Sequence, residues 1–400
     1  MKFVAILLSM LVCACGGGGS APPPASGLTV TPGGGQVTVS WTMTPGVEYW
    51  LLYAPVASIS TNDLPAGHLW ATNITSPYVV SGLVDGTTYS FTLNGRTGGG
   101  PGGPGTPSVS AIPRPAGEIW TPGPALGSNT LRGLSFGSTS DSGGSNFVAV
   151  GDAGAIFKTT DGITWTNISP GPAVNLNASL NALGKFVVAG AAGAISYSSD
   201  LSFWSAAASN TSANLHALAT NGSLAVAVGD TGTIRYSTDA ATWYSAASVP
   251  TTANLYGVAY ALNGRWVAVG AGGTLLTSTD GSNWSALASG TSANLKAVAV
   301  QTAFVYTFVA VGDAGTVLRS YDGLTWSTQQ IDSAPNLTAL AAGIDQFLAV
   351  GMAGAAFTSV DGGASWTRKN TGSTANLYGL SGTSVFYVAA GQNGSLITSR

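Results

Sequence analysis

Two sets of aspartates recur along residues 118–400 and are the first candidates for chemistry in this sequence. Carboxylates of this kind can ligate a cation, accept hydrogen bonds from sugar hydroxyls or act as acid and base in glycoside hydrolysis. The first set follows a Ser/Thr-x pair and precedes a tryptophan: Asp161, Asp200, Asp239, Asp280, Asp322 and Asp361. The second set stands in Gly-Asp-x-Gly turns: Asp152, Asp230 and Asp313.

The first set is better explained by structure than by catalysis. An aspartate in a tight turn hydrogen-bonds its own backbone, and the preceding Ser or Thr hydroxyl does the same. The tryptophan that follows is suited to packing between neighbouring sheets. Because the same residues are used in the same way in every repeat, we expect them to support the repeat, and we assign no catalytic residue.

The second set leaves two interpretations open. The equivalent position in the other repeats holds Ala191, Ala271, Met352 or Gln392, so the three carboxylates are not a general need of the turn. We expect these turns to share a face with the loops after each tryptophan, where three carboxylates could take a cation or sugar hydroxyls. An aspartate two residues before a glycine is also simply good turn chemistry. Asp152, Asp230 and Asp313 therefore form a candidate ligand face.

Composition argues against several other kinds of site. The only histidines are His68 and His216, and both cysteines, Cys13 and Cys15, lie in the first fifteen residues. We therefore predict no metal site, no disulfide framework and no cofactor. The 13 Lys and Arg are scattered along the sequence and the net charge is −3, which argues against nucleic-acid binding.

Two further patterns recur seven times and predict the elements that position these residues. One is Asn-Leu, at Asn175-Leu176, Asn214-Leu215, Asn254-Leu255, Asn294-Leu295, Asn336-Leu337 and Asn376-Leu377, with a degenerate Asn129-Thr130-Leu131 ahead of them. The other is an apolar strand ending in glycine, at Phe147–Gly151, Phe186–Gly190, Ala225–Gly229, Trp266–Gly270, Phe308–Gly312, Phe347–Gly351 and Tyr387–Gly391. A spacing of roughly 40 residues suits four-stranded blades, so residues 118–400 are predicted to form a seven-bladed β-propeller.

The tryptophan pattern is complete in only six repeats, which predicts how the ring closes. The seventh tryptophan is Trp120, at the start of the region, while the chain stops at Arg400 where a seventh Asp-Trp pair would begin. A propeller must pair its last edge strand or leave it exposed. We therefore expect the outer strand of the last blade to come from Ile119 and Trp120, and its three inner strands from residues 375–400.

The last copy of the tryptophan pattern, Ser359-Val-Asp-Gly-Gly-Ala-Ser-Trp366, resembles the Asp-box, or bacterial neuraminidase repeat. Overall the region is most similar to the propeller of photosystem II stability and assembly factors. The resemblance implies a propeller fold with the Asp-box turns at its periphery. It does not carry an activity. Sialidase chemistry needs an arginine cluster and a Tyr–Glu pair, but the only glutamate here is Glu118, and the basic patch of the assembly factors has no counterpart clustered in this sequence.

Residues 27–115 predict a separate β-sandwich. Polar and apolar residues alternate in Gln36–Trp41 and Thr88–Leu93, with turn residues between the runs. Together with the run Val47–Tyr53 and Leu83-Val-Asp-Gly-Thr-Thr-Tyr89, this region resembles a fibronectin type III domain. In that family the Leu packs in the core and the Tyr forms a corner with the backbone. We expect the domain to act as a spacer.

Residues 1–14 are typical of a signal peptide, with Lys2 before an apolar stretch too short to span a bilayer. Val12-Cys13-Ala14-Cys15 resembles the bacterial lipobox, which implies cleavage before Cys15 and lipidation of its thiol. Residues 15–26 then form a Gly/Pro-rich tether. In a Gram-negative cell, Gly16 directly after the lipidated cysteine would favour the outer membrane over the inner membrane. The alternative is an ordinary secretory signal with an incidental cysteine.

These observations together favour an all-β, exported, lipid-anchored protein of the bacterial cell envelope. We expect it to be a non-catalytic binding or scaffolding protein whose propeller recognises a protein or a glycan. The loops after each tryptophan, such as residues 205–212 and 285–292, are rich in small hydroxyl residues, which suits a polar binding face and plain solvated loops equally. The alternative function is a glycan-active enzyme, a hydrolase or a lyase.

Overall fold

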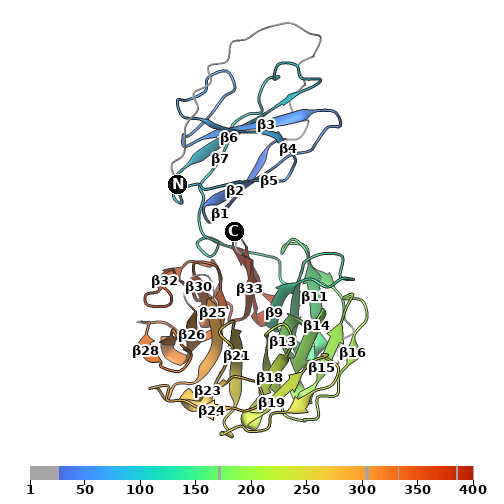
Figure 1. The fold of residues 1–400 in the computed structure, drawn as a ribbon, viewed down its shortest axis with the longest axis vertical. Helices are drawn as coiled ribbons and strands as arrows, with labels where there is room; N and C mark the ends of the chain where they lie inside the picture. The colour runs from blue at the N-terminus through green and yellow to red at the C-terminus, as the bar shows by residue number, and fades with distance from the viewer. Residues whose placement is uncertain (1–26, 170–172, 302–305, 332, 384–385, 400) are drawn as a thin grey trace. The chain divides into compact units, whose positions relative to one another are not determined.

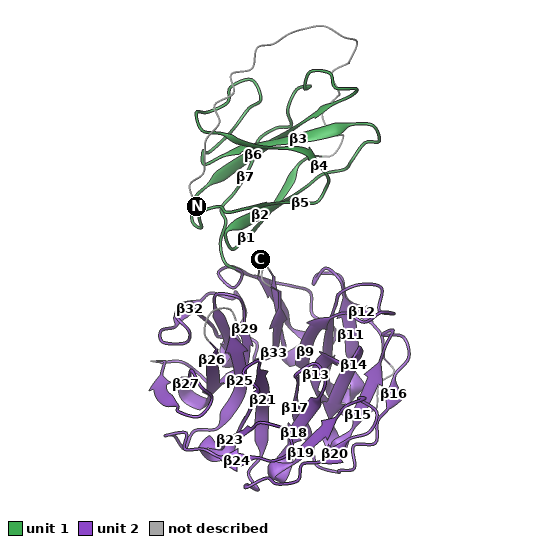
Figure 2. Ribbon diagram, viewed as in Figure 1, with its two compact units in different colours: residues 1–115 green, residues 116–400 purple. Residues whose placement is uncertain are grey.

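The computed structural model describes residues 27–169, 173–301, 306–331, 333–383 and 386–399. The chain divides into two compact units, Met1–Pro115 and Ala116–Arg400 (Figure 2). Regular structure in the described ranges consists of β-strands and single turns of 3-10 helix. The predicted signal peptide, tether and Cys15 lie outside these ranges. Within them, no helix is both long and apolar enough to cross a membrane.

Unit 1 contains two antiparallel sheets around one apolar core. One sheet has the order β1 (Thr29–Gly33), β2 (Gln36–Ser40), β5 (Tyr78–Ser81), and the other β4 (Leu69–Ile74), β3 (Glu48–Ala54), β6 (Tyr89–Arg96), β7 (Val109–Ala111). Residues in β2 alternate between the core and the other face as predicted, because Val37 and Val39 are buried in one cluster with Leu51 and Phe91. The Tyr89 hydroxyl accepts a hydrogen bond from the Val84 backbone N–H at 3.2 Å.

Seven antiparallel sheets of four strands make up the described part of unit 2. The first four are β9 (Leu131–Gly137) with β10 (Asn146–Gly151), β11 (Ile156–Thr159) and β12 (Thr166–Asn167); β13 (Leu176–Ala182) with β14 (Lys185–Gly190), β15 (Ile195–Ser198) and β16 (Ser205–Ala206); β17 (Leu215–Thr220) with β18 (Ala225–Gly229), β19 (Ile234–Ser237) and β20 (Tyr244–Ser245); and β21 (Leu255–Ala261) with β22 (Arg265–Gly270), β23 (Leu275–Ser278) and β24 (Ser285–Ala286).

The remaining three sheets follow the same order along the chain until the last one. They are β25 (Leu295–Gln301) with β26 (Thr307–Gly312), β27 (Thr316–Ser320) and β28 (Ser327–Gln330); β29 (Leu337–Ala342) with β30 (Phe347–Gly351), β31 (Ala356–Ser359) and β32 (Thr367–Lys369); and β33 (Leu377–Gly382) with β34 (Tyr387–Gly391), β35 (Leu396–Ser399) and β8 (Trp120–Pro122). The first strands of successive sheets are neighbours, and β33 lies beside β9 (Figure 1). The sheets therefore form a closed ring.

The second strand of each sheet is apolar over the four residues before its final glycine because both of its faces are covered. In β10, Val148 and Val150 pack in one cluster with Phe186 of the second sheet. The alternate residues Phe147 and Ala149 pack in another cluster with residues of the seventh sheet. A strand buried on both faces reads as a continuous apolar run rather than an alternating one, which explains the most conspicuous pattern in the sequence.

The ring closes through the strand that the sequence predicts. Trp120 in β8 pairs with Ser399 in β35, so the seventh sheet is built from the two ends of unit 2. The Ser399 hydroxyl accepts a hydrogen bond from the Gly117 N–H at 2.8 Å and donates one to the Ile119 carbonyl at 2.6 Å. These bonds satisfy backbone groups that an exposed edge strand would leave unpaired.

Candidate ligand-binding site

The second strand of each sheet in unit 2 ends in a glycine that leads into a three-residue turn. The turns are η1 (Asp152–Gly154), η2 (Ala191–Gly193), η3 (Asp230–Gly232), η4 (Ala271–Gly273), η5 (Asp313–Gly315), η6 (Met352–Gly354) and η7 (Gln392–Gly394). The strand-ending glycine is needed because the first strand passes very close to it. A Cβ added to Gly190 would lie 2.0 Å from the Asn175 carbonyl oxygen, well inside contact distance.

The asparagine of the Asn-Leu pattern holds consecutive sheets together. The Asn175 carbonyl accepts a hydrogen bond from Ala191 N–H at 2.8 Å within its own sheet. Its side-chain oxygen accepts one from Ala153 N–H at 3.0 Å, in the turn of the preceding sheet. The same bridge recurs at the five later Asn-Leu pairs. At the degenerate copy Thr130 occupies the place of the asparagine, so the joint between the last and first sheets is made differently.

The first strand of each sheet has a β-bulge directly after the leucine that recurs in all seven sheets. In the second sheet the pairing passes from Leu176↔Gly190 to Ala178↔Ala189 and leaves Asn177 without a partner in the ladder. A bulge of this kind turns a side chain away from the regular alternation of the strand. The bulged residues of the seven sheets are Arg132, Asn177, His216, Tyr256, Lys296, Thr338 and Tyr378.

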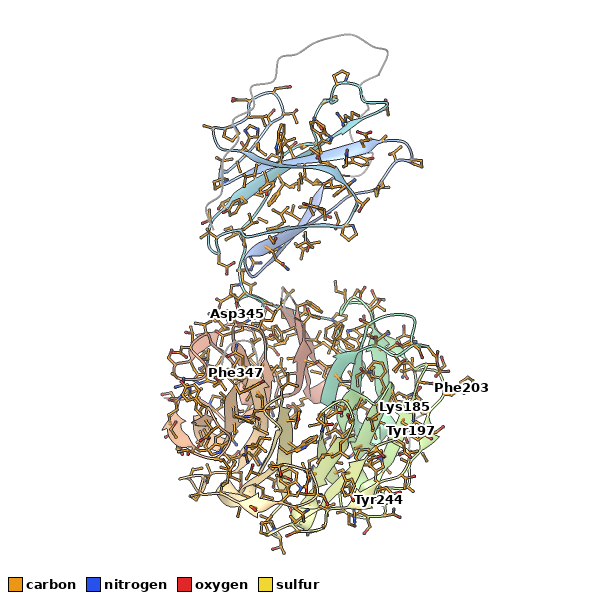
Figure 3. The ribbon with its side chains drawn as sticks, viewed as in Figure 1. Lys185, Tyr197, Phe203, Tyr244, Asp345 and Phe347 are labelled. Atoms are coloured by element: carbon orange, nitrogen blue, oxygen red, sulfur yellow. The ribbon has the colours of Figure 1, made fainter. Side chains whose placement is uncertain are left out.

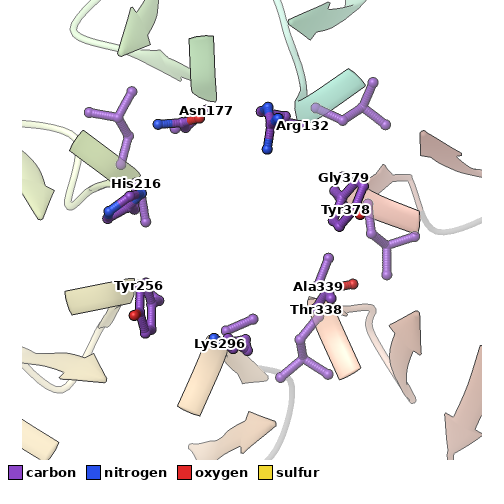
Figure 4. Close-up of a pocket in the computed structure, with 18 of the residues that line it drawn as sticks. Arg132, Asn177, His216, Tyr256, Lys296, Thr338, Ala339, Tyr378 and Gly379 are labelled. Carbon is purple, nitrogen blue, oxygen red and sulfur yellow. The ribbon is translucent and has the colours of Figure 1, made fainter. Parts of the chain in front are cut away.

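These seven residues, named the mouth ring below, surround one central opening (Figure 4). The opening holds about 170 Å³. The next lining residue of each strand is a glycine or an alanine, and the third is Leu134, Ser179, Leu218, Val258, Val298, Leu340 or Leu380. The small residues are required by the close approach of neighbouring strands, since a Cβ on Gly133 would lie 2.8 Å from the Ala178 Cα. The opening thus has a polar mouth above a mainly apolar wall.

The candidate aspartates stand in the three sheets whose mouth-ring residue is basic. In the first sheet Arg132 Nε donates to Asp152 Oδ1 at 2.6 Å. In the third sheet His216 Nε2 lies 2.7 Å from Asp230 Oδ1. The fifth sheet combines Lys296 with Asp313. Two of the three carboxylates are therefore paired with a basic side chain of the mouth ring, and no group of three metal-ligating side chains occurs in the described ranges.

The fifth sheet departs from this pairing. Lys296 Nζ lies 4.2 Å from the centre of the Tyr256 ring, in the neighbouring sheet. Asp313 Oδ2 accepts a hydrogen bond from the Asn294 side chain at 2.7 Å, whereas Asp313 Oδ1 is buried without a hydrogen-bond partner in the described structure. The Lys296 ammonium group therefore contacts the face of an aromatic ring where the other two basic residues contact a carboxylate, and this contact also stabilises a cation.

Asp230 has the clearest electrostatic signature among the candidate aspartates. Burial raises the pKa of its carboxyl, but hydrogen bonds from His216 and Asn214 and the charge of His216 outweigh that effect, so the pKa lies below the ordinary value of an aspartate. Asn214 Nδ2 donates to Asp230 Oδ2 at 2.8 Å. Asp230 is therefore held as a carboxylate that orients the imidazole.

The neutral members of the mouth ring are also fixed by neighbouring groups. Asn177 Nδ2 donates to the Leu215 carbonyl at 2.8 Å, and Thr338 Oγ1 donates to the Leu377 carbonyl, in each case on the first strand of the next sheet. The rings of His216 and Tyr256 lie 5.5 Å apart with a tilt of 58°. Since Asn177 and Thr338 use their N–H and O–H groups on the backbone, their oxygen lone pairs remain available to a ligand.

The first set of aspartates lies elsewhere, in the turns before the fourth strands. Asp161 Oδ1 accepts hydrogen bonds from the backbone N–H groups of Ile163 and Thr164 at 2.7 and 2.8 Å, and from the Thr159 hydroxyl at 2.7 Å. The same bonds recur at Asp200, Asp239, Asp280, Asp322 and Asp361. Phe203, in the turn of Asp200, is 81% exposed at the outer edge of the ring (Figure 3). These carboxylates are used by their own turns.

Sequence reasoning missed the mouth ring. The signal was present, because the residue directly after the repeated leucine varies between basic, amide, hydroxyl and aromatic types, whereas the residue after it is always glycine or alanine. The Lys and Arg are scattered along the sequence, yet Arg132 and Lys296 line the same opening once the ring closes.

No family model matches the chain, and no curated protein sequence matches it. Several solved structures are similar to part of the chain. "YCF48 bound to D1 peptide" is 17% identical over 71% of this chain and 94% of its own, with a TM-score of 0.56. YCF48 from Cyanidioschyzon merolae is 19% identical over 70% of this chain and 98% of its own, with a TM-score of 0.56. The WD40 β-propeller domain of Doa1 is 9% identical over 71% of this chain and 97% of its own, with a TM-score of 0.58.

Unit 2 has a β-propeller fold. The similarity of the propeller to proteins as different in sequence as YCF48 and Doa1 concerns the fold alone. What the propeller of this chain recognises must be argued from its own residues.

Proposed function

We propose that this chain is a non-catalytic recognition protein that holds a protein or glycan ligand at the mouth ring of a seven-bladed propeller. One observation carries the proposal: seven bulged side chains, one from each four-stranded sheet, face a single opening. They include Arg132 and His216, each held by an aspartate, and Lys296. Side chains with fixed orientation lose little conformational freedom on binding, which favours affinity.

The identity of the lining residues favours binding over turnover. A glycosidase of the usual type needs two carboxyl groups flanking the scissile bond. None of the residues that line the opening is acidic, and the two aspartates in contact with mouth-ring side chains, Asp152 and Asp230, are engaged with Arg132 and His216. YCF48 has been solved with a peptide bound, which supports a recognition role for a propeller of this kind.

We further propose that Cys15 carries a lipid anchor that holds the protein in the bacterial cell envelope, at the outer membrane. Residues 15–26 would be the tether, and the sandwich of residues 27–115 a fibronectin type III-like spacer. The lipobox pattern supports the anchor, and the two-sheet core of unit 1 supports the spacer. The repeated turns around Asp161 and its five equivalents support an Asp-box propeller.

The test compares the wild-type chain with the double variant Arg132→Gln/Lys296→Gln. A glycan array and capture from a cell-envelope extract are run with both, together with a screen for glycan hydrolysis. We expect at least one ligand that the wild type retains and the double variant loses, and no turnover. Turnover that is abolished by Asp230→Ala, with the melting curve unchanged, would contradict the non-catalytic role. Ligands bound equally by both proteins would place recognition away from the mouth ring.

A further inference from the structure

We propose that the mouth ring recognises the terminal oxyanion of a sugar sulfate or sugar phosphate. The inference rests on the proposed function and adds the ligand class. It starts from the position of the basic side chains, which come from the first, third and fifth sheets of the ring. Arg132, His216 and Lys296 therefore stand on different sides of the opening instead of forming one patch (Figure 4).

A group that is to be held from three sides needs acceptors that point in three directions. A sulfate or phosphate monoester presents three terminal oxygens around the axis of its ester bond, so each basic residue has an oxygen to meet. A carboxylate presents two oxygens in one plane, and the planar fork of a single arginine satisfies both. The distribution of the cations thus favours the tetrahedral group.

The two paired aspartates leave donor groups of Arg132 and His216 available to a ligand in the opening. Asp152 accepts from Arg132 Nε, so the terminal guanidinium nitrogens are left to donate to a ligand. Asp230 is bonded to His216 Nε2, so the other ring nitrogen is left to meet an anion, which it does as a donor N–H. Because the aspartates belong to the turns behind the ring residues, a ligand in the opening meets the basic groups first.

The neutral ring members specify what carries the oxyanion. The free lone pairs of Asn177 Oδ1 and Thr338 Oγ1 accept hydrogen bonds, and a sugar hydroxyl is a donor that suits both. Tyr378 adds a phenol that can donate or accept. A ring of three bases alternating with hydroxyl and amide groups therefore suits an anionic sugar better than an inorganic ion alone.

Isothermal titration of the purified chain in a chloride buffer free of sulfate and phosphate tests the inference. The probes are glucose 6-sulfate, glucose 6-phosphate, glucuronate and glucose. We expect one or both esters to bind, with affinity at least about tenfold above that of glucuronate and glucose. The two ester arms distinguish a sulfated from a phosphorylated source. Equal binding of glucuronate would assign the ring to carboxylates and overturn the inference, as would equal binding of glucose.

Variants then place the ester on the mouth ring. Arg132→Gln and Lys296→Gln should each weaken ester binding about tenfold or more, because a hydrogen bond to a charged group is lost. Arg132→Lys keeps the charge but not the planar guanidinium, so its affinity for the ester should lie between those of the wild type and Arg132→Gln. It also provides a test at this position if Arg132→Gln does not fold. Lys158→Gln makes the same charge change in the third strand of the first sheet, outside the residues that line the opening, and should change nothing.

Ester binding that survives both ring substitutions would overturn the assignment. If neither ester binds, while a glycan or protein from the broader screen still depends on Arg132 and Lys296, only the ligand class fails and the recognition role stands. If nothing binds in a ring-dependent way, both proposals fail.

Discussion

Arg132 is the bulged residue of the first strand, and the 2.6 Å bond from its Nε to Oδ1 of Asp152, in the turn after the second strand, fixes this mouth-ring side chain from behind. Arg132 follows the leucine of the first strand, and Asp152 begins the turn after the second strand. Because the bulge takes Arg132 out of the regular strand pairing, its side chain contacts Asp152 of the same sheet.

This pairing predicts the effect of Asp152→Ala. Arg132 would keep its charge but lose its fixed orientation, so we expect ligand binding at the mouth ring to weaken about tenfold, the effect of one charged hydrogen bond. The melting temperature should change little, because both side chains are partly exposed and such ion pairs contribute at most about 1 kcal/mol to stability. Asp141→Ala, at an exposed loop residue, is the matched control. A large loss of stability with unchanged binding would assign Asp152 to the turn alone.

The close approach at the bulge predicts that Gly190→Ala is strongly destabilising. The new Cβ would meet the Asn175 carbonyl at 2.0 Å, and backbone must move to relieve the clash. We expect a loss of at least about 2 kcal/mol in the free energy of unfolding, measured for the propeller by chemical denaturation. Gly222→Ala introduces no clash and should cost only about 1 kcal/mol, for the left-handed conformation at φ 92°. Equal effects at the two sites would argue against steric crowding.

Closure of the ring predicts the effect of Ser399→Ala. The buried hydroxyl bonds to Gly117 N–H and to the Ile119 carbonyl, and its removal leaves both groups unsatisfied. We expect the free energy of unfolding of the propeller to fall by about 1–3 kcal/mol. Ser395→Ala, at a less buried serine beside the same strand, serves as the comparison and should have a smaller effect. An unaltered unfolding curve for Ser399→Ala would count against closure by both ends of the unit.

The turn aspartates predict a pH dependence of stability. Hydrogen bonds from the backbone N–H groups of Thr325 and Leu324 lower the pKa of Asp322 to about 2. Since the folded pKa is below the ordinary value of 3.8, the contribution of Asp322 is fully present above about pH 4 and is lost as the pH falls towards 2. Melting curves of wild type and Asp322→Asn should differ at pH 5 and converge near pH 2. A constant difference between them would contradict the low pKa.

The proposed lipid anchor predicts that Cys15→Ser releases the protein from the membrane. Without the thiol the lipid cannot be attached, so the variant should move from the membrane fraction to the soluble fraction of a bacterial host. Cys13→Ser keeps the proposed acceptor and should stay with the membrane. Unchanged fractionation of Cys15→Ser would refute the lipobox interpretation.

The sequence alone determined the repeat and even its closure. Strands, turns and the hydrogen bonds of the turn aspartates depend on residues close together along the chain, as Asp161 bonds to Thr159 and Thr164. The pairing of Trp120 with Ser399 is distant, but the mismatch between seven Asn-Leu patterns and six complete tryptophan patterns made it predictable.

Only the tertiary structure decided what the aspartates of the Gly-Asp-x-Gly turns do. From the sequence, Asp230 could be either a turn residue or a ligand-binding residue. Its pairing with His216 could not be predicted, because it depends on the register of two strands. The mouth ring is likewise a product of closure. Arg132 and Lys296 meet at one opening because each sheet repeats the same bulge and the ring brings the seven bulges around a common axis, which no local stretch of sequence encodes.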